Sequence, residues 1–238
     1  MLVQACWNFE NMQSVGFLYT ILPGLEKIYA GEPDKIREAA KRHVEFFNTH
    51  PYFSSHLAAM SLAFEEKIQK GEVEPSAVNS AKVGLMGSLG AIGDSFFWGS
   101  LKPFVSLMSV LAALVNPYLG IVLLVLAYNY FHLRMRIMGF KMSLASPNGI
   151  YQYLRENNFA EKNEYIRALV MIFLGVYLGF FISRILAVDQ KFVFTGIQFL
   201  VSLCLVVALE FIYRKIAATS EIVIFSAMFV VLISLVMG

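Results

Sequence analysis

The residue that most clearly could do chemistry in this sequence is Asp94, a single acid inside an apolar stretch rich in glycine. The glycines around it are Gly84, Gly87, Gly90, Gly93 and Gly99. A step of three residues drifts around the axis of an α-helix, so this spacing predicts a tight or broken helix that backbone or a ligand approaches closely. An acid in such a setting predicts a functional site. Capping of a helix over residues 95–101 by Asp94 is the alternative.

A second polar group, Asn48-Thr49-His50-Pro51, stands where a helical pattern ends. These residues offer hydrogen-bond donors, acceptors and one titratable ring, a set that could bind sugar hydroxyls or a partner that carries phosphate. The residue before a proline avoids the helical region, so the spacing by itself favours the alternative, a turn that ends the helix.

The sequence identifies no catalytic residue. It contains no Walker motif, no Gly-x-Ser-x-Gly elbow and no paired-carboxylate site. His43 and His50 lack companions at metal-ligand spacing, and Cys6 and Cys204 give no disulfide framework. We therefore expect a chain without catalytic chemistry of its own, without a metal and without a cofactor.

The composition is that of a membrane protein. Of the 238 residues 58% are hydrophobic and only 15% are charged, and the mean hydropathy is +0.62. A soluble domain is about one quarter charged, so this composition indicates a membrane protein, and the hydrophobic spans exclude a soluble enzyme. The net charge of +2, with no basic run, argues against nucleic acid as a partner.

Residues 1–82 predict an amphipathic and water-facing helical part. Residues 7–29 are too polar to face lipid all round, which suggests an interfacial helix or one packed on a partner, interrupted at Pro23-Gly24. Helical patterns follow from Pro33 to the Asn48–Pro51 group and over residues 54–70.

The remainder reads as mostly membrane. Residues 83–131 predict a glycine-rich, broken-helix hairpin that Asn116-Pro117 divides, either as two spans or as a re-entrant hairpin with a span and a second half-helix. Residues 166–238 predict C-terminal transmembrane helices. The candidate spans there are 166–187, 192–213 and 222–237.

Positive charges set the expected orientation. Lys and Arg gather between residues 132 and 167 and at Arg214-Lys215. The positive-inside rule therefore places a 132–165 loop in the cytoplasm and Gly238 outside. The N-terminal part is cytoplasmic as well if residues 83–131 cross an even number of times.

Three segments carry a resemblance to a known family. They are Trp7-Asn-Phe-Glu-Asn-Met-Gln13, Phe46-Phe-Asn-Thr-His-Pro-Tyr52 and Gly93-Asp-Ser-Phe-Phe-Trp-Gly-Ser-Leu-Lys-Pro103. In this order, across nearly the whole chain, they resemble the IID membrane subunits of the mannose/fructose/sorbose family of bacterial sugar phosphotransferase systems (PTS).

The resemblance implies an all-α, polytopic protein of the bacterial inner membrane. Its small helical N-terminal part is cytoplasmic, and an irregular hairpin and C-terminal helices lie in the lipid membrane. In the family a IID subunit pairs with IIC to carry a hexose-type sugar, which IIB, supplied by IIA, phosphorylates during uptake. Trimers of IIC–IID pairs that move in an elevator-like way are expected.

The motifs also imply which residues lie near the sugar. They are Asn48, Thr49, His50, Pro51, Gly93, Asp94, Ser95, Trp98 and Asn129. The chain departs from the family at two places. Ser88 stands where the family commonly has a proline, and Phe131-His132 stand where the family follows the asparagine matched by Asn129 with a proline and an arginine. A divergent IID that senses phosphotransferase status without moving sugar is therefore the alternative function.

Overall fold

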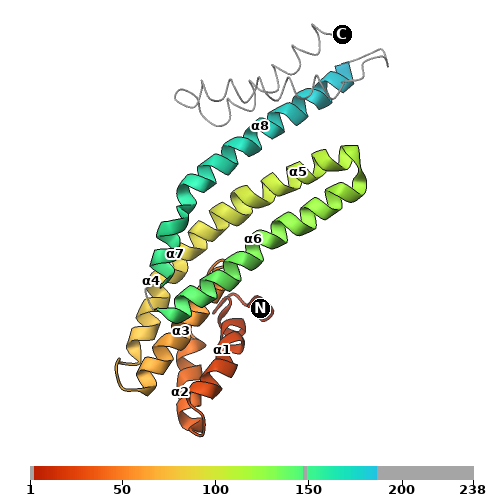
Figure 1. The fold of residues 1–238 in the computed structure, drawn as a ribbon. Helices are drawn as coiled ribbons and strands as arrows, with labels where there is room; N and C mark the ends of the chain where they lie inside the picture. The colour runs from red at the N-terminus through yellow and green to blue at the C-terminus, as the bar shows by residue number, and fades with distance from the viewer. Residues whose placement is uncertain (1–2, 147–148, 187–238) are drawn as a thin grey trace. The chain divides into compact units, whose positions relative to one another are not determined.

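The computed structural model describes residues 3–146 and 149–186, and this part of the chain is predominantly helical (Figure 1). The elements in order are α1 (Ser14–Ile28), α2 (Pro33–His43), α3 (Ser54–Gln69), α4 (Ser76–Gly93), the π-helical segment η1 (Asp94–Leu101), α5 (Lys102–Val115), α6 (Pro117–Ala145), α7 (Gly149–Asn157) and α8 (Phe159–Leu186). No strand occurs among these residues, which confirms the all-α expectation. The candidate spans 192–213 and 222–237 lie outside the described residues.

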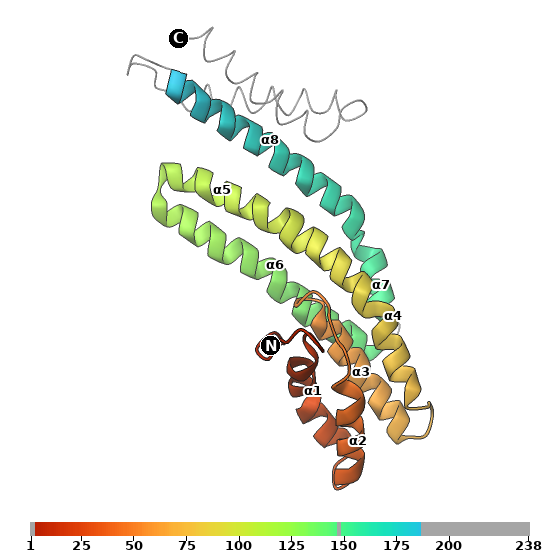
Figure 2. The same cartoon turned by 180° about the vertical axis from the view of Figure 1, so that it is seen from behind.

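The chain forms two compact units, and each is described by itself. The first comprises residues 1–99 and 125–162, and the second comprises residues 100–124 and 163–238. In the first unit α1 packs on α2 and α3, and α3 packs on α4, as Figures 1 and 2 show from opposite sides. The residues of the candidate site all belong to this first unit.

The apolar face of α1 explains why this helix forms. Phe17, Ile21 and Leu25 recur at helical spacing and are buried. Burying each such side chain contributes about 1.5–3 kcal/mol. The expected interruption at Pro23-Gly24 is wrong, because α1 continues through Pro23. Packing along this face outweighs the hydrogen bond that proline removes.

A buried carboxylate ties the first three helices together. Glu65 of α3 accepts two hydrogen bonds from Arg42, one from Tyr29 and one from His43, all at 2.7–2.8 Å. Burial would raise the pKa of Glu65, but these hydrogen bonds outweigh it and hold the pKa at about 2. Burial lowers the pKa of His43, so this ring is neutral and donates through Nε2.

The second unit includes α5, the start of α6 and the turn between them. Asn116 is extended, with φ −154° and ψ 122°, and its side-chain oxygen accepts a hydrogen bond from the Tyr118 backbone N–H at 2.9 Å. The predicted division at Asn116-Pro117 is confirmed. Gly120 lies so close to Ala113 that a β-carbon there would collide with it, which holds the two helices together at the turn.

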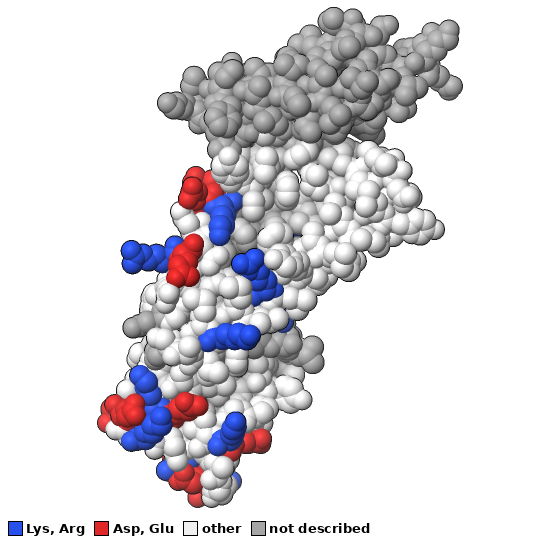
Figure 3. All heavy atoms as spheres, viewed as in Figure 1, with Lys and Arg blue, Asp and Glu red and all other residues white. Residues whose placement is uncertain are grey.

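Two helical stretches of the described chain are long and apolar enough to cross a membrane, residues 76–115 and α6. Around their turn large apolar side chains are exposed, including Leu114 at 64% and Val115 at 84%. Figure 3 shows charged side chains gathered over α1–α3 and near α7, and none over the α5–α6 turn. Such exposed apolar surface suits lipid or a membrane partner.

One further expectation is corrected by the helices themselves. The helix predicted to be tight or broken at the glycines does not break: residues 76–115 stay helical and widen into the π-helical segment η1. The segment 132–165, predicted to be a cytoplasmic loop between spans, is largely helical, because α6 runs on to Ala145 and is followed by α7 and the start of α8. Its position in the cytoplasm stays a prediction.

Candidate functional site

The Asn48–Pro51 group forms an elbow between α2 and α3. The helix before it ends at His43, so these residues do not end a helix as the spacing favoured. Instead the His50 carbonyl accepts the backbone N–H of Phe53 at 2.9 Å and starts α3. Thr49 and His50 are buried, whereas Asn48 is exposed.

The His50 ring lies against the glycine-rich motif. It stacks on Phe97 with ring centres 5.1 Å apart and an interplanar angle of 14°, and its centre is 4.9 Å from that of Trp98. A β-carbon on Gly93 would collide with the His50 side chain. The predicted close approach at a glycine is therefore confirmed here: the structure brings His50, Gly93 and Trp98 together.

The protonation of His50 follows from its contacts. The Tyr52 backbone N–H donates to Nδ1 at 3.3 Å, so in the neutral ring the proton is on Nε2. Burial and then the charge of Arg136 lower the pKa of His50 to about 4, which keeps the ring neutral at pH 7. The Nε2 atom is buried and has no hydrogen-bond partner among the described residues. The Nε2–H group is therefore a hydrogen-bond donor without an acceptor among the described residues.

Asp94 and Trp98 present the outer side of the same motif. Asp94 has helical dihedral angles, φ −62° and ψ −46°, inside a continuous helix, so capping of a new helix at residue 95 is not what the structure shows. Its carboxylate is exposed and has no described hydrogen bond or ion pair in residues 3–146 and 149–186. Trp98 is 47% exposed, and Ser95 is exposed as well.

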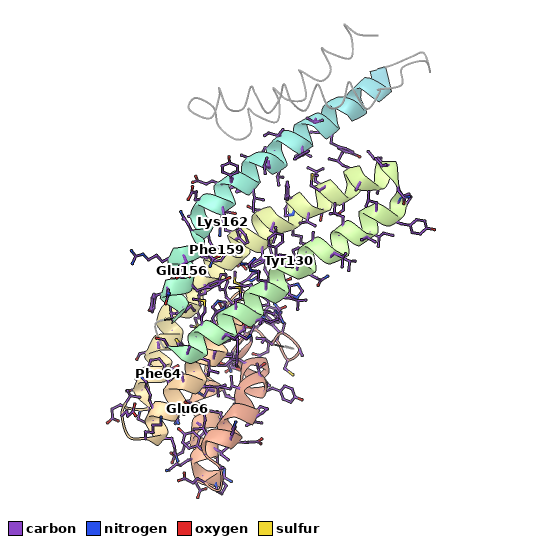
Figure 4. All side chains as sticks on the ribbon, viewed as in Figure 1. Phe64, Glu66, Tyr130, Glu156, Phe159 and Lys162 are labelled. Atoms are coloured by element: carbon purple, nitrogen blue, oxygen red, sulfur yellow. The ribbon has the colours of Figure 1, made fainter. Side chains whose placement is uncertain are left out.

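The motif is held from behind by aromatic packing. Phe159 lies at the start of α8 (Figure 4). It packs on Phe53 and Phe96 with ring centres 5.6 and 5.1 Å apart. Phe96 in turn packs edge-on against Phe97, and the His50 ring stacks on Phe97. The π-helical turn is thus fixed from α3 and from α8.

Helix α6 adds residues that the sequence reasoning missed. Tyr52 stacks on His132 with ring centres 4.7 Å apart, its hydroxyl donates to Tyr128 at 3.1 Å, and the Arg136 guanidinium lies 5.1 Å from its ring centre. Steps of four from 128 to 136 place these residues on one helix face, a pattern that could have revealed them. Asn129 faces elsewhere: it is exposed and donates to the Val125 carbonyl at 2.7 Å.

The N-terminal motif clamps the elbow. The Gln13 side chain donates to the Thr49 carbonyl at 2.8 Å and accepts the Thr49 backbone N–H at 3.4 Å. The Gln13 backbone N–H donates to the Phe47 carbonyl at 2.8 Å, and the Phe47 ring stacks on Phe17 at 4.0 Å. Three motifs far apart in sequence therefore meet at the elbow: Gln13 contacts Thr49, and the Gly93 motif contacts His50. No cluster of His, Cys, Asp and Glu able to hold a metal occurs among the described residues.

Comparison with known proteins gives related sequences. Over 139 residues the chain is 36% identical to the mannose-specific PTS EIID component of Escherichia coli K12, which covers 58% of this chain and 49% of that protein. It is 30% identical to the fructose permease IID component of Bacillus subtilis, over 73% of this chain and 63% of that one. The chain thus spans about half the length of the E. coli relative that it matches.

Solved structures are similar too. The chain matches a chain of the cryo-EM structure of the mannose transporter ManYZ with microcin E492, with a TM-score of 0.59, 31% identity, and coverage of 71% of this chain and 64% of that one. It also matches a structure described as a membrane protein, with a TM-score of 0.67, 30% identity, and coverage of 74% and 65%. The family model of the PTS mannose/fructose/sorbose family IID component matches residues 1–238. The chain therefore belongs to the IID components of the mannose/fructose/sorbose family of phosphotransferase systems.

Proposed function

We propose that this chain forms, with a IIC subunit, the pathway by which a hexose-type sugar crosses the inner membrane while IIB, supplied by IIA, phosphorylates it. The observation that carries the proposal is the seating of His50 against Gly93. It joins the elbow to the Gly-Asp-Ser motif and sets the exposed Trp98 ring against His50, and we propose that the two motifs form one sugar-binding surface. The relatives named for mannose, fructose and sorbose support a sugar as the substrate.

The surface has the chemistry that a sugar needs. Hydroxyl groups donate well to a carboxylate, which Asp94 offers, and accept from an N–H, which His50 offers. The apolar face of a sugar ring packs on an indole, which Trp98 offers. Asn48, Thr49, Pro51 and Ser95 complete the proposed site by their position in the two motifs. Asn129 lacks a described contact with the elbow and is its least supported member.

The proposed setting is a complex in the membrane. IID components are membrane proteins, and the exposed apolar side chains of α5 and α6 need lipid or a partner to cover them. We propose IIC as that partner, in trimers of IIC–IID pairs. The basic residues of 132–167 support a cytoplasmic position for that segment and for the N-terminal part, with the C-terminus outside.

The regulatory alternative rested on departures from the family pattern, and the family match does not favour it. Ser88 lies within the continuous helix α4. His132 and its neighbours lie in the continuous helix α6. A sugar sensor that transports nothing would give no uptake in the assay that follows.

Uptake by membrane vesicles tests the proposal and the role of Asp94 together. Vesicles that contain the chain with its IIC partner should accumulate labelled hexose when phosphorylated IIB is present. Asp94→Asn should lower this uptake about tenfold or more, because it removes a charged acceptor worth about 1.5–3 kcal/mol. The exposed side chain should tolerate the change, so assembly with IIC should persist. Wild-type uptake by assembled Asp94→Asn would remove Asp94 from the site.

Gln13→Ala should also weaken transport, but through the elbow. It leaves the buried Thr49 N–H and carbonyl without their partner, at about 1–3 kcal/mol for each group. We expect a raised KM for uptake, about tenfold, with a smaller change in maximal rate, because the elbow loses its position before the protein loses assembly. The control is Gln152→Ala, which removes an exposed glutamine bonded only to Glu156 among the described residues. Equal effects of the two changes would contradict the clamp.

A further inference from the structure

Tyr52 links the elbow to helix α6. It directly follows Pro51 and is half-buried. Its ring lies nearly parallel to the His132 ring, with centres 4.7 Å apart and an interplanar angle of 17°, and its hydroxyl donates to the Tyr128 hydroxyl at 3.1 Å. The Arg136 guanidinium lies 5.1 Å from the same ring centre. One face of α6 therefore holds Tyr52 by stacking, by a hydrogen bond and by a cation–π contact.

The Tyr52 ring also contacts the elbow histidine and the motif around Gly93. The rings of His50 and Phe97 both stand nearly perpendicular to it, each with its centre 4.8 Å away. The Tyr52 backbone N–H donates to His50 Nδ1, and the His50 ring centre lies 4.9 Å from that of Trp98. Aromatic rings in such close contact transmit a shift rather than absorb it. A displacement of Tyr52 therefore reaches His50, and through it the proposed sugar-binding surface.

The hydrogen bond between the two tyrosine hydroxyls is the most directional of these contacts. A hydrogen bond weakens steeply once donor and acceptor leave their preferred distance and angle, whereas aromatic rings pack well in several offset arrangements. The bond joins residues that are 76 positions apart in the sequence. It therefore fixes where the elbow lies against α6.

We propose that Tyr52 is a positioning residue for hexose binding: the Tyr128 hydroxyl holds its ring on α6, and the ring in turn holds His50 in place at the sugar-binding surface. This assignment rests on the proposed function. Tyr52 acts through His50 and not on the sugar, so loss of its hydroxyl weakens the affinity for the sugar and leaves the later steps of transport unchanged. This face of α6, which lies outside the three sequence motifs, thus takes part in sugar binding.

The test uses membrane vesicles that contain the full chain with its IIC partner, with phosphorylated IIB present and labelled mannose, fructose or sorbose as the probe. Tyr52→Phe and Tyr128→Phe each remove one hydroxyl and keep the ring. Each should raise the KM for uptake about three- to tenfold, the effect of one hydrogen bond, with the maximal rate within about twofold. The double variant should be no worse than the weaker single variant, because all three lack the same bond.

Tyr130→Phe is the matched control. Tyr130 is exposed on the same helix (Figure 4), and its hydroxyl accepts a hydrogen bond from Arg134. This variant should transport like the wild type, because its hydroxyl has no described contact with the elbow.

A second readout follows the position of His50 without transport. A fluorinated tryptophan, placed at position 98 alone in the assembled complex, reports the rings around it through its fluorine NMR shift. That shift should move in Tyr52→Phe and in Tyr128→Phe, because His50 lies next to Trp98, and should stay unchanged in Tyr130→Phe.

Unchanged KM and an unchanged fluorine shift in both variants would overturn the inference. Additive losses in the double variant would show that the two hydroxyls act separately, and a raised KM with an unmoved fluorine shift would show that Tyr52 acts on the sugar directly. Either result removes the positioning role. All of these outcomes leave the proposed function standing, because the wild type still transports. A wild type that takes up none of the three sugars would sink the proposed function itself and this inference with it.

Discussion

Gly93→Ala is expected to lower hexose uptake about tenfold or more without preventing assembly. The added β-carbon would meet the Cβ and Cγ atoms of His50, and this ring cannot retreat because Phe97 lies parallel to it. Overpacking of this kind costs about 1–3 kcal/mol, and about 1.4 kcal/mol corresponds to a tenfold change. Because His50 belongs to the elbow, the collision displaces the elbow and with it the proposed sugar-binding surface.

Gly87→Ala is the matched control. Gly87 lies on the same helix, and a β-carbon there would meet nothing within 4 Å. Alanine is the better helix former by about 1 kcal/mol, so this variant should be as stable as the wild type or more so, with unchanged uptake. Both variants are compared for assembly with IIC and then for uptake. If Gly93→Ala transports like Gly87→Ala, the seating of His50 has no part in transport.

The helix-based features of the fold were predictable because they depend on local patterns. Pro33 at the first turn marked the start of α2, and Asn116-Pro117 marked the division of the hairpin. The importance of close approach at the glycines was also predictable, since only glycine offers it. Which glycines are used was not: Gly93 meets His50, whereas Gly84 and Gly87 face open space. That distinction depends on where the elbow lies in three dimensions.

The remaining features of the site depend on contacts between distant segments. Nothing local in Gln13 shows that its amide fits the backbone of Thr49. His56 is a similar case, because its buried ring lies against Gly139 of α6 and neither residue belongs to a recognised motif. The π-helical widening at Asp94 also has no unique sequence signal: the glycine spacing suggested irregular helix but not the direction of the irregularity.

The largest effect on stability is expected from Glu65→Gln. This change keeps the size of the side chain but replaces a buried carboxylate, which now accepts from Arg42, Tyr29 and His43, by an amide that accepts at one atom only. Breaking a buried ion pair by removing one partner costs about 3–5 kcal/mol. Linkage gives a similar figure: a fall in pKa from 4.5 to about 2 corresponds to about 3 kcal/mol.

The sign of the pH dependence follows from the same shift. The pKa of Glu65 is lower in the folded state than in the unfolded state, so its stabilising contribution is complete above about pH 5 and is lost as the pH falls from 4.5 toward 2. The wild type should therefore exceed Glu65→Gln in unfolding midpoint at pH 7, and the gap should narrow over that acid range. The measurement is unfolding of the assembled protein in detergent, followed by the fluorescence of Trp7 and Trp98.

Glu66→Gln is the control, since Glu66 is the next residue of α3 and is exposed (Figure 4). Its replacement should change the unfolding free energy by no more than about 0.5 kcal/mol, as surface substitutions do. If Glu65→Gln unfolds at the same midpoint as Glu66→Gln at pH 7, the carboxylate does not hold α1, α2 and α3 together. A gap between wild type and Glu65→Gln that stays constant down to pH 2 would instead show that packing, and not the charge, sets the difference. The shape of the Glu65 side chain, and not its charge, would then account for its contribution to stability.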